Sequence, residues 1–308
     1  MGLFIAFTII AIIFTAIYYS WGKPDRLEVY RNIIDHTLTI TDPYGYMGAT
    51  SMHTKTYFGL EATREQNKIV GHERIMVGEW QVNFLFSSMS LPEEENYGRQ
   101  SQEQPAFAFP GLGTRGMSDW NQLENLSEGT VVSGYVSFSE LLETKEVFDL
   151  LEGKNIDLLW LAVDTGGEDK VPTKGTIFDP IGFPSFPIWH DDDFIVTEHS
   201  EEDSGWLGGK VVSESAVSPE YEEGDYAVLH EQFIKTLKFL KQHENKADKL
   251  VWGELNISER LNYLEEHGFQ HYGAVITGPT KEILKLQNDD SIAELEVDEV
   301  AFWNWNEQ

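Results

Sequence analysis

The hydrophobic pattern of this chain opens with an unbroken apolar run. The residues from Leu3 to Trp21 carry no charge, and as a helix rising about 1.5 Å per residue they would span roughly 28 Å, the thickness of a bilayer core. No Lys or Arg precedes the run, and its end, with Tyr18 and Tyr19 before Trp21, resembles an interfacial aromatic belt more than a cleavage site. The pattern predicts an uncleaved transmembrane anchor over residues 1–22 that contacts the lipid bilayer through residues 3–21. A signal peptide and a buried core helix are the alternatives.

The segment after the anchor changes from helical to strand-like periodicity. Apolar positions in "RLEVYRNIIDHTLTI" predict a juxtamembrane helix, and "TKTYFGLEAT", "KIVGHERIMV" and "EWQVNFLFS" predict strands. We therefore expect a β-rich N-terminal regulator domain over residues 23–90. The polar stretch 91–122, rich in Gly, Pro, Gln and Glu, predicts a linker.

The remainder, residues 123–308, predicts a C-terminal regulator domain of mixed structure. A strand in "GTVVSGYVSF", a helix ended by Gly153 and a buried strand in "IDLLWLAVDTG" come first. A Gly-, Pro- and Asp-rich excursion runs from residue 166 to about 224, and amphipathic helices follow at about 226–243 and 257–267. The end reads strand "HYGAVIT", helix "PTKEILKLQ" and strand "IAELEVDEVAFWNW".

Two segments of this region resemble each other. Residues 144–161 and 280–297 align without a gap, and six positions are identical. Each copy spans the order strand, helix, strand, which indicates two βαβ units in a ferredoxin-like pseudo-repeat with helices on one face of an antiparallel sheet. A chance likeness between two βαβ units is the alternative. The expected fold class is α+β: one transmembrane helix, a β-rich membrane-proximal part, and a C-terminal α/β sandwich with inserted helices.

Charge and composition narrow the classes of function. The chain has 52 acidic and 22 basic residues, a formal net charge of −30, so nucleic acid is disfavoured as a partner, and so is docking on anionic lipid. It contains no cysteine, which excludes disulfides, thiol catalysis and Cys-ligated zinc. A cysteine-free chain outside the membrane is unremarkable for a Gram-positive bacterium but unusual for a eukaryotic secreted protein.

Candidate chemistry is sparse. In "IWHDDDF", Asp191 and Asp193 are candidates for calcium ligands. They are weak candidates, because neighbouring side chains of an extended chain point to opposite sides and the three consecutive aspartates cannot easily all face one ion. A solvated acidic loop explains the same letters. No G-x-S-x-G or H-E-x-x-H motif is present, and the nine histidines form no H-x₃-H pair. We expect no catalytic residue, no cofactor and no enzymatic activity; the alternatives are a membrane-tethered solute- or calcium-binding envelope protein and an enzyme acting on cell-wall material.

Several stretches together resemble one family. "MHTKTYFGLEA" followed by "EWQVNFLFSSMS" is similar to the N-terminal half of the sigma-factor-regulator type of anti-sigma factor from Bacillus-like bacteria. Four later stretches are similar to the C-terminal half of the same family: "VVSGYVSFSELLETKEVFDLLEGKNIDLLWLAVDTG", "IGFPSFPIWH", "RLNYLEEHGFQHYGAVITGPTKEILKLQ" and "VDEVAFWNW". The order and number of these stretches carry the match, which covers nearly the whole chain after Gly22.

The resemblance implies a negative regulator of an extracytoplasmic-function sigma factor in the cell membrane. Members hold the sigma factor with a cytoplasmic segment before a single span, and their large C-terminal region lies outside as a sensor or docking module. This sequence departs there, because only Met1 and Gly2 precede the apolar run. We therefore expect sigma-factor contact only through a missing segment or a partner membrane protein. The basic residues Lys23, Arg26 and Arg31 follow the run, and by the positive-inside rule they favour the opposite orientation.

Overall fold

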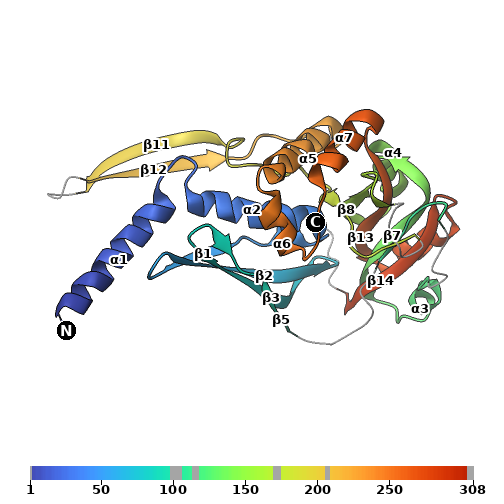
Figure 1. Cartoon of the computed structure of the whole chain (residues 1–308). Helices are drawn as coiled ribbons and strands as arrows, with labels where there is room; N and C mark the ends of the chain where they lie inside the picture. The colour runs from blue at the N-terminus through green and yellow to red at the C-terminus, as the bar shows by residue number, and fades with distance from the viewer. Residues whose placement is uncertain (1, 98–105, 113–117, 169–174, 205–208, 304–308) are drawn as a thin grey trace.

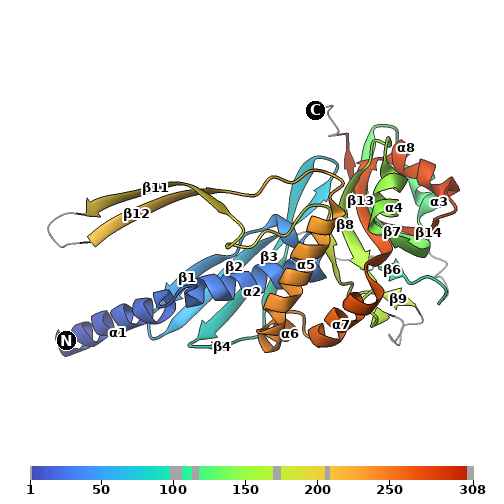
Figure 2. The same ribbon diagram turned by 90° about the horizontal axis from the view of Figure 1, so that it is seen from above.

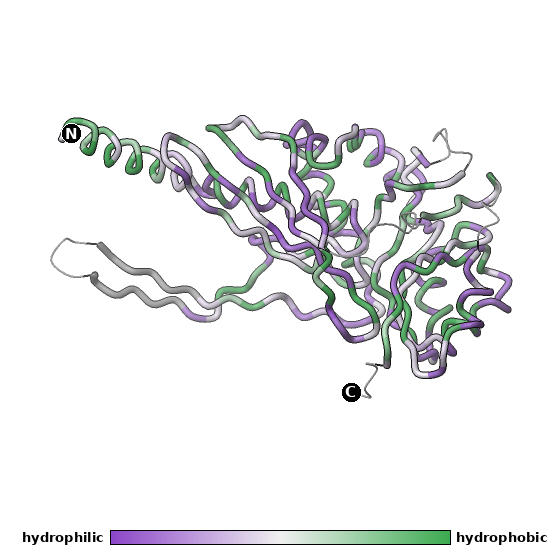
Figure 3. The backbone as a smooth tube through the Cα atoms, turned by 90° about the horizontal axis from the view of Figure 1, so that it is seen from below, coloured by the Kyte–Doolittle hydropathy of each residue, from purple (hydrophilic) through white to green (hydrophobic). Residues whose placement is uncertain are grey.

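Two helices connected by a short turn begin the fold. The computed structural model describes residues 2–97, 106–112, 118–168, 175–204 and 209–303, with the backbone alone for 199–204 and 209–214. Helix α1 (Gly2–Ser20) projects from the body of the protein, and α2 (Arg26–Thr41) lies within it (Figure 1). Among the described residues, α1 is the one helix long and apolar enough to cross a membrane, which agrees with the predicted anchor. Its hydrophobic character stands out along the tube in Figure 3.

The turn between α1 and α2 is fixed by side chains. Asp25 is the N-cap of α2, and its carboxylate accepts a hydrogen bond from the N–H of Glu28 at 2.8 Å. Arg26 donates to the carbonyl of Tyr18 at 2.8 Å and lies over the Tyr18 ring. A cation on the last carbonyls of α1 complements the helix dipole. These contacts hold the end of α1 against the start of α2.

The first sheet forms the β-rich membrane-proximal part, as predicted. It is antiparallel, with the order β1-β2-β3-β4 and with β5 also paired to β3. Helix α2 packs on one face, where Tyr30 stacks on Phe84 at 4.7 Å and Ile33 and Ile34 are buried with Trp80. The 3₁₀ helix η1 (Gly45–Met47) follows α2. The strands are β1 (Ser51–Lys55), β2 (Gly59–Val70), β3 (Glu73–Leu85), β4 (Ser88–Met89) and β5 (Glu93–Asn96).

The second sheet is the centre of the C-terminal region. Its order is β10-β8-β13-β7-β14, and all its described pairs are antiparallel. Its strands are β7 (Thr130–Glu143), β8 (Asp157–Val163), β10 (Gly182–Pro184), β13 (Gln270–Pro279) and β14 (Ile292–Phe302). The helices of this region are α3 (Trp120–Glu124), α4 (Thr144–Leu151), α5 (Tyr226–Lys241), α6 (Glu244–Leu250), α7 (Ile257–His267), α8 (Thr280–Ile283) and η4 (Leu284–Asn288).

The two strand–helix–strand segments interleave in this sheet. Helix α4 connects β7 to β8, and α8 with η4 connects β13 to β14. Strand β13 lies between β7 and β8, and β7 lies between β13 and β14, so each segment places one strand of the other between its own pair. The mixed fold and the inserted helices α5 and α7 are as predicted. The ferredoxin-like assignment and the duplication stay predictions.

The second sheet buries both of its faces. One face carries Val136, Leu161 and Ile276 against the helices α4, α5 and α7 (Figure 2). The other carries Tyr135, Trp160, Tyr272 and Val275. This second face is covered by Tyr44 and Met47 around η1, and by the small ribbon of β6 (Phe107–Ala108) and β9 (Thr176–Ile177). The N-terminal part therefore completes the core of the C-terminal part.

The excursion from residue 166 to 224 contains a long hairpin that the sequence pattern did not indicate. Strands β11 (Ile195–Ser204) and β12 (Gly209–Val217) pair antiparallel and project on the same side as α1 (Figures 1 and 2). The pattern failed because both strands mix acidic, Ser and β-branched residues with no sustained alternation of apolar and polar positions. Within the predicted linker 91–122, β5, β6 and α3 are ordered elements, while residues 98–105 and 113–117 lie outside the described part.

Candidate functional site at the junction of the two parts

The N- and C-terminal parts meet along α2, and the polar side chains there form the candidate site. From α2, Asn32 donates its amide to a carboxylate oxygen of Asp191 at 2.9 Å, and Arg31 forms an ion pair with the same oxygen at 3.4 Å. Asp191 belongs to the segment that follows β10. The contact thus joins the helix next to the anchor with the C-terminal region.

The acidic turn 191–193 does not gather its carboxylates at one point. Lys235 on α5 donates to Asp192 at 2.7 Å and to Asp193 at 2.6 Å, whereas Asp191 turns to α2. Asp193 also accepts the N–H of His190 at 2.9 Å. Burial opposes ionisation of Asp193, but these donors outweigh it and hold its pKa below the usual range. The described residues contain no group of three or more His, Asp or Glu placed to hold a metal ion. Calcium binding by Asp191 and Asp193 stays a prediction in which the cation must displace Lys235.

A pair of stacked imidazoles lies beside this turn. The rings of His36 on α2 and His190 are 4.1 Å apart, and Phe239 packs edge-on against His36. The Nε2 atom of His190 shares a hydrogen bond with the Thr236 hydroxyl at 2.9 Å, while Nε2 of His36 has no partner among the described residues. Burial lowers the pKa of His36 to about 3 and also lowers the pKa of His190. Both rings are therefore neutral at pH 7.

A buried arginine anchors the floor of the junction. The Arg64 side chain is only 3% exposed; it forms an ion pair with Asp35 of α2 and donates to the carbonyl of Gly45 and the hydroxyl of Thr50. Thr50 donates to Asp35 at 2.6 Å. Burial raises the pKa of Asp35, and the guanidinium of Arg64 opposes this rise. This cluster connects α2, η1 and β2.

A pocket of about 350 Å³ opens between α2 and the segment 184–194. Its wall offers two cations, two carboxylates and several rings, so it suits a small ligand or a short peptide that has both charged and apolar parts. Burial raises the pKa of Tyr46, which stays neutral against the Phe186 ring. The residues that line it include Arg31, Asp35, Arg64, Tyr46, Phe186 and Asp191.

A second line of contacts holds the two parts together behind the pocket. The indole N–H of Trp160 on β8 donates to the carbonyl of Thr39 on α2 at 3.1 Å. Asp298 of β14 accepts the Tyr44 hydroxyl at 2.8 Å and the Lys68 ammonium at 2.5 Å. Burial raises the pKa of Tyr44, and Asp298 adds to the shift. Hydrogen bonds and an ion pair thus join the N-terminal part to the C-terminal sheet behind the pocket.

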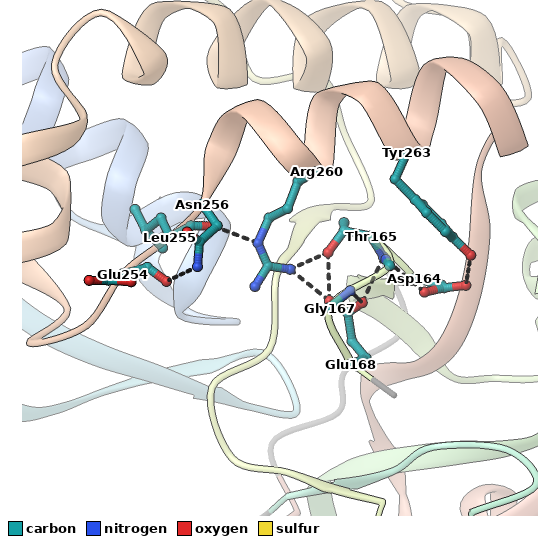
Figure 4. A network of polar contacts seen from close by, with 10 residues as sticks. Asp164, Thr165, Gly167, Glu168, Glu254, Leu255, Asn256, Arg260 and Tyr263 are labelled. Carbon is teal, nitrogen blue, oxygen red and sulfur yellow. Dashed lines mark hydrogen bonds and ion pairs between the residues drawn. The ribbon is translucent and has the colours of Figure 1, made fainter. Parts of the chain in front are cut away.

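A separate polar network closes the loop after β8 (Figure 4). Glu168 accepts hydrogen bonds from the N–H groups of Thr165 and Gly167 at 2.9 Å and forms an ion pair with Arg260 of α7 at 2.8 Å. Burial alone would raise the pKa of Glu168, but Arg260 and the Thr165 donors outweigh it and lower the pKa. Gly166 is required here, since its φ is +79° and a Cβ would lie 2.3 Å from the Tyr263 ring. The network satisfies its own charges and fixes the loop on α7.

Comparison with known proteins places these features in a family. A family model described as sigma factor regulator C-terminal matches residues 123–299, more than half of the chain. A second model, sigma factor regulator N-terminal, matches residues 1–75. The chain belongs to the sigma factor regulator family. This membership confirms the resemblance to anti-sigma factors of Bacillus.

One relative of this sigma factor regulator shows the extent of the likeness. The chain is 26% identical over 295 residues to a protein of Bacillus subtilis (strain 168) described as probable anti-sigma-M factor YhdL. The match covers 94% of this chain and 74% of the relative. No solved structure matches the chain.

The pocket lies between the two matched regions of the sigma factor regulator. Arg31, His36 and Arg64 come from the region matched by the N-terminal model, while Phe186 and Asp191 come from the C-terminal one. Sequence reasoning identified Asp191 and missed His36 and Arg64. One signal for Arg64 was available, because it continues the buried alternation of Leu60 and Ala62 in β2.

Proposed function

We propose that this sigma factor regulator is a non-catalytic sensor anchored by α1, with the region after α1 outside the cell membrane. Its partner is a sigma factor, which the relative described as a probable anti-sigma-M factor supports, and we propose that this sigma factor is of the extracytoplasmic-function class. The observation that carries the proposal is the position of α2. Five residues separate it from the end of α1, and it packs on the first sheet and carries one wall of the junction pocket.

A ligand or partner in the pocket would act directly on α2. Arg31 and Asn32 contact Asp191 from one side of the pocket, and Arg26 at the start of the same helix holds the carbonyl of Tyr18 in α1. A change in how the two parts close on each other would therefore move the end of α1. Of the three basic residues that closely follow α1, Lys23, Arg26 and Arg31, the last two make these contacts. Their position is therefore weaker evidence that the region after α1 lies inside the cell.

The orientation is tested by protease treatment of intact cells that carry the protein with a C-terminal tag. We expect loss of the region after Gly22 while a cytoplasmic marker protein stays intact. The acidic, cysteine-free region would then face the outside, as proposed. Full protection of the tag until the cells are lysed contradicts the proposed orientation and supports the inverted one.

The regulatory role is tested by deleting the protein from its cells. Expression from the promoters of the partner sigma factor is expected to rise, because the negative regulator is gone. We propose that contact with the sigma factor is made on the cytoplasmic side, by a segment there or by a partner membrane protein. A version with α1 replaced by a cleaved secretion signal should then fail to restore repression. Restoration by that detached version would contradict signalling through α1.

A further inference from the structure

Two turns of the first sheet lie against the membrane-side helix. The turn of residues 56–58 connects β1 to β2, and the turn at 86–87 connects β3 to β4. The N–H of Phe58 donates to the Thr15 hydroxyl of α1 at 2.9 Å. The Tyr19 hydroxyl donates to the carbonyls of Phe58 at 2.8 Å and Phe86 at 3.2 Å. Both turns are thus fastened to α1 itself.

The contacts extend well along α1 toward its N-terminus. Thr15 lies one turn before Tyr19, about 6 Å further along the axis. The Tyr57 ring is 6.1 Å from that of Phe7, which lies about 18 Å from Tyr19 along the same axis. The buried positions of α1 are Ala11, Thr15 and Tyr19, a single stripe that faces the sheet. With α1 in a bilayer and Tyr19 in its interface, the two turns extend from that level toward the acyl chains beside α1.

The side chains at these turns are apolar and exposed. Tyr57 and Phe86 are each 44% exposed, and Leu85 beside them is 56% exposed. The rings of Phe58 and Phe86 stack at 4.5 Å, and Tyr18 of α1 packs edge-on against both. Aromatic rings with one polar edge prefer the boundary between headgroups and acyl chains.

The backbone of the turns shows an unusual choice of residues. Tyr57, Phe58 and Phe86 have φ values of +61°, +61° and +55°, where hairpin turns favour Gly, Asn or Asp. Large rings at these positions carry a steric cost that the sheet alone does not explain. In addition, Phe86 donates its N–H to the carbonyl of Phe58 at 3.0 Å. The amide and carbonyl groups of Phe58 and the carbonyl of Phe86 are therefore paired, as burial away from water requires.

We propose that residues 56–58 and 85–87 form an aromatic wedge that enters the bilayer interface beside α1. The proposal rests on the anchoring of α1 proposed above and adds a second membrane contact to it. The attraction to the bilayer comes from burial of apolar side chains. Anionic lipid does not contribute to it, because the chain as a whole is strongly acidic. The wedge fixes the height of the first sheet above the membrane, and with it the position of α2.

The test exploits the absence of cysteine, which lets single cysteines carry a nitroxide spin label in the full chain. Leu85→Cys and Tyr57→Cys label the wedge and leave the stack of Phe58 on Phe86 in place. Ile10→Cys marks α1, and Met76→Cys is the matched control: an exposed apolar residue of the same strand as Leu85, about 30 Å from the wedge. The protein is reconstituted in phosphatidylcholine vesicles.

The measured quantity is the ratio of label collisions with oxygen, which concentrates in lipid, to collisions with a water-soluble nickel chelate. We expect ratios at positions 57 and 85 several-fold above that at 76. Ratios at 57 and 85 equal to that at 76, with a lipid-like ratio at 10, overturn the wedge and leave the anchor in place. A water-like ratio at 10 as well overturns both the wedge and the anchoring.

Discussion

Replacing Arg64 by leucine is expected to lower the free energy of unfolding by about 3 kcal/mol, because a buried ion pair loses one partner. The side chain is 3% exposed and satisfies Asp35, Thr50 and the carbonyl of Gly45 at once. Leucine removes the donor that all three share, although Asp35 keeps the hydroxyl of Thr50. Because Asp35 is itself partly exposed, the expected loss is at the lower end of the range for buried pairs. Denaturant titration of the protein in detergent measures the change.

The pH dependence of this variant identifies the cause. Without Arg64, the pKa of Asp35 in the folded state rises further above its unfolded value, so protonation favours the folded state. The deficit of Arg64→Leu should shrink as the pH falls from 8 to 5. Lys281→Met is the control, since its pair with Glu128 is exposed and should contribute little to stability. A constant deficit across this pH range would show that packing, not charge, explains the loss.

Acid is expected to destabilise the protein through its buried histidines. Burial lowers the pKa of both His36 and His271 to about 3, well below the unfolded value of about 6.5. Between these pKa values the unfolded chain binds protons that the folded one does not, so stability falls as the pH falls through 6.5. Each residue should cost about 2 kcal/mol between pH 7 and pH 5.

Variants isolate this contribution from carboxyl groups such as Asp42, whose raised pKa acts in the opposite direction. His36→Phe keeps the ring stack and removes a nitrogen that has no partner among the described residues. It should be neutral or stabilising at pH 7 and lose about 2 kcal/mol less than the parent on going to pH 5. His271→Gln tests the second site, and exposed His53→Gln is the control. An unchanged acid response in both buried-site variants would contradict the assignment.

The sequence predicted those parts of the fold in which local pattern and packing agree. The apolar run of α1, the alternation in β2 and β3, and the buried strand β8 each carry a period that specifies one structure. The two amphipathic helices after residue 225 were equally clear. The hairpin β11–β12 was missed because its strands show no sustained alternation of apolar and polar residues, and the structure shows it projecting from the body (Figure 1).

The candidate site was far less predictable from the sequence. Asp191 was a candidate because it stands in a run of three aspartates, yet its partners Arg31 and Asn32 lie about 160 positions away in the sequence. His36 sits in an ordinary helical pattern, and only the approach of the segment after β10 places it against His190. Sites built where two parts of a chain meet have no local motif, because each part supplies half of the chemistry.

The hairpin β11–β12 points toward the membrane when α1 lies in a bilayer. Its strands, about 33 Å long, leave the body on the same side as α1 (Figure 2), yet their sequence carries Glu198, Glu201, Glu202 and Asp203. Carboxylates are excluded from hydrocarbon at a cost of several kcal/mol each, so this arm cannot follow α1 across the membrane. With α1 in a bilayer, we therefore expect the arm to stay on the aqueous side of the lipid surface. The hairpin starts directly after the acidic turn at Asp191, so a force that the lipid surface exerted on the arm would be transmitted to the wall of the junction pocket.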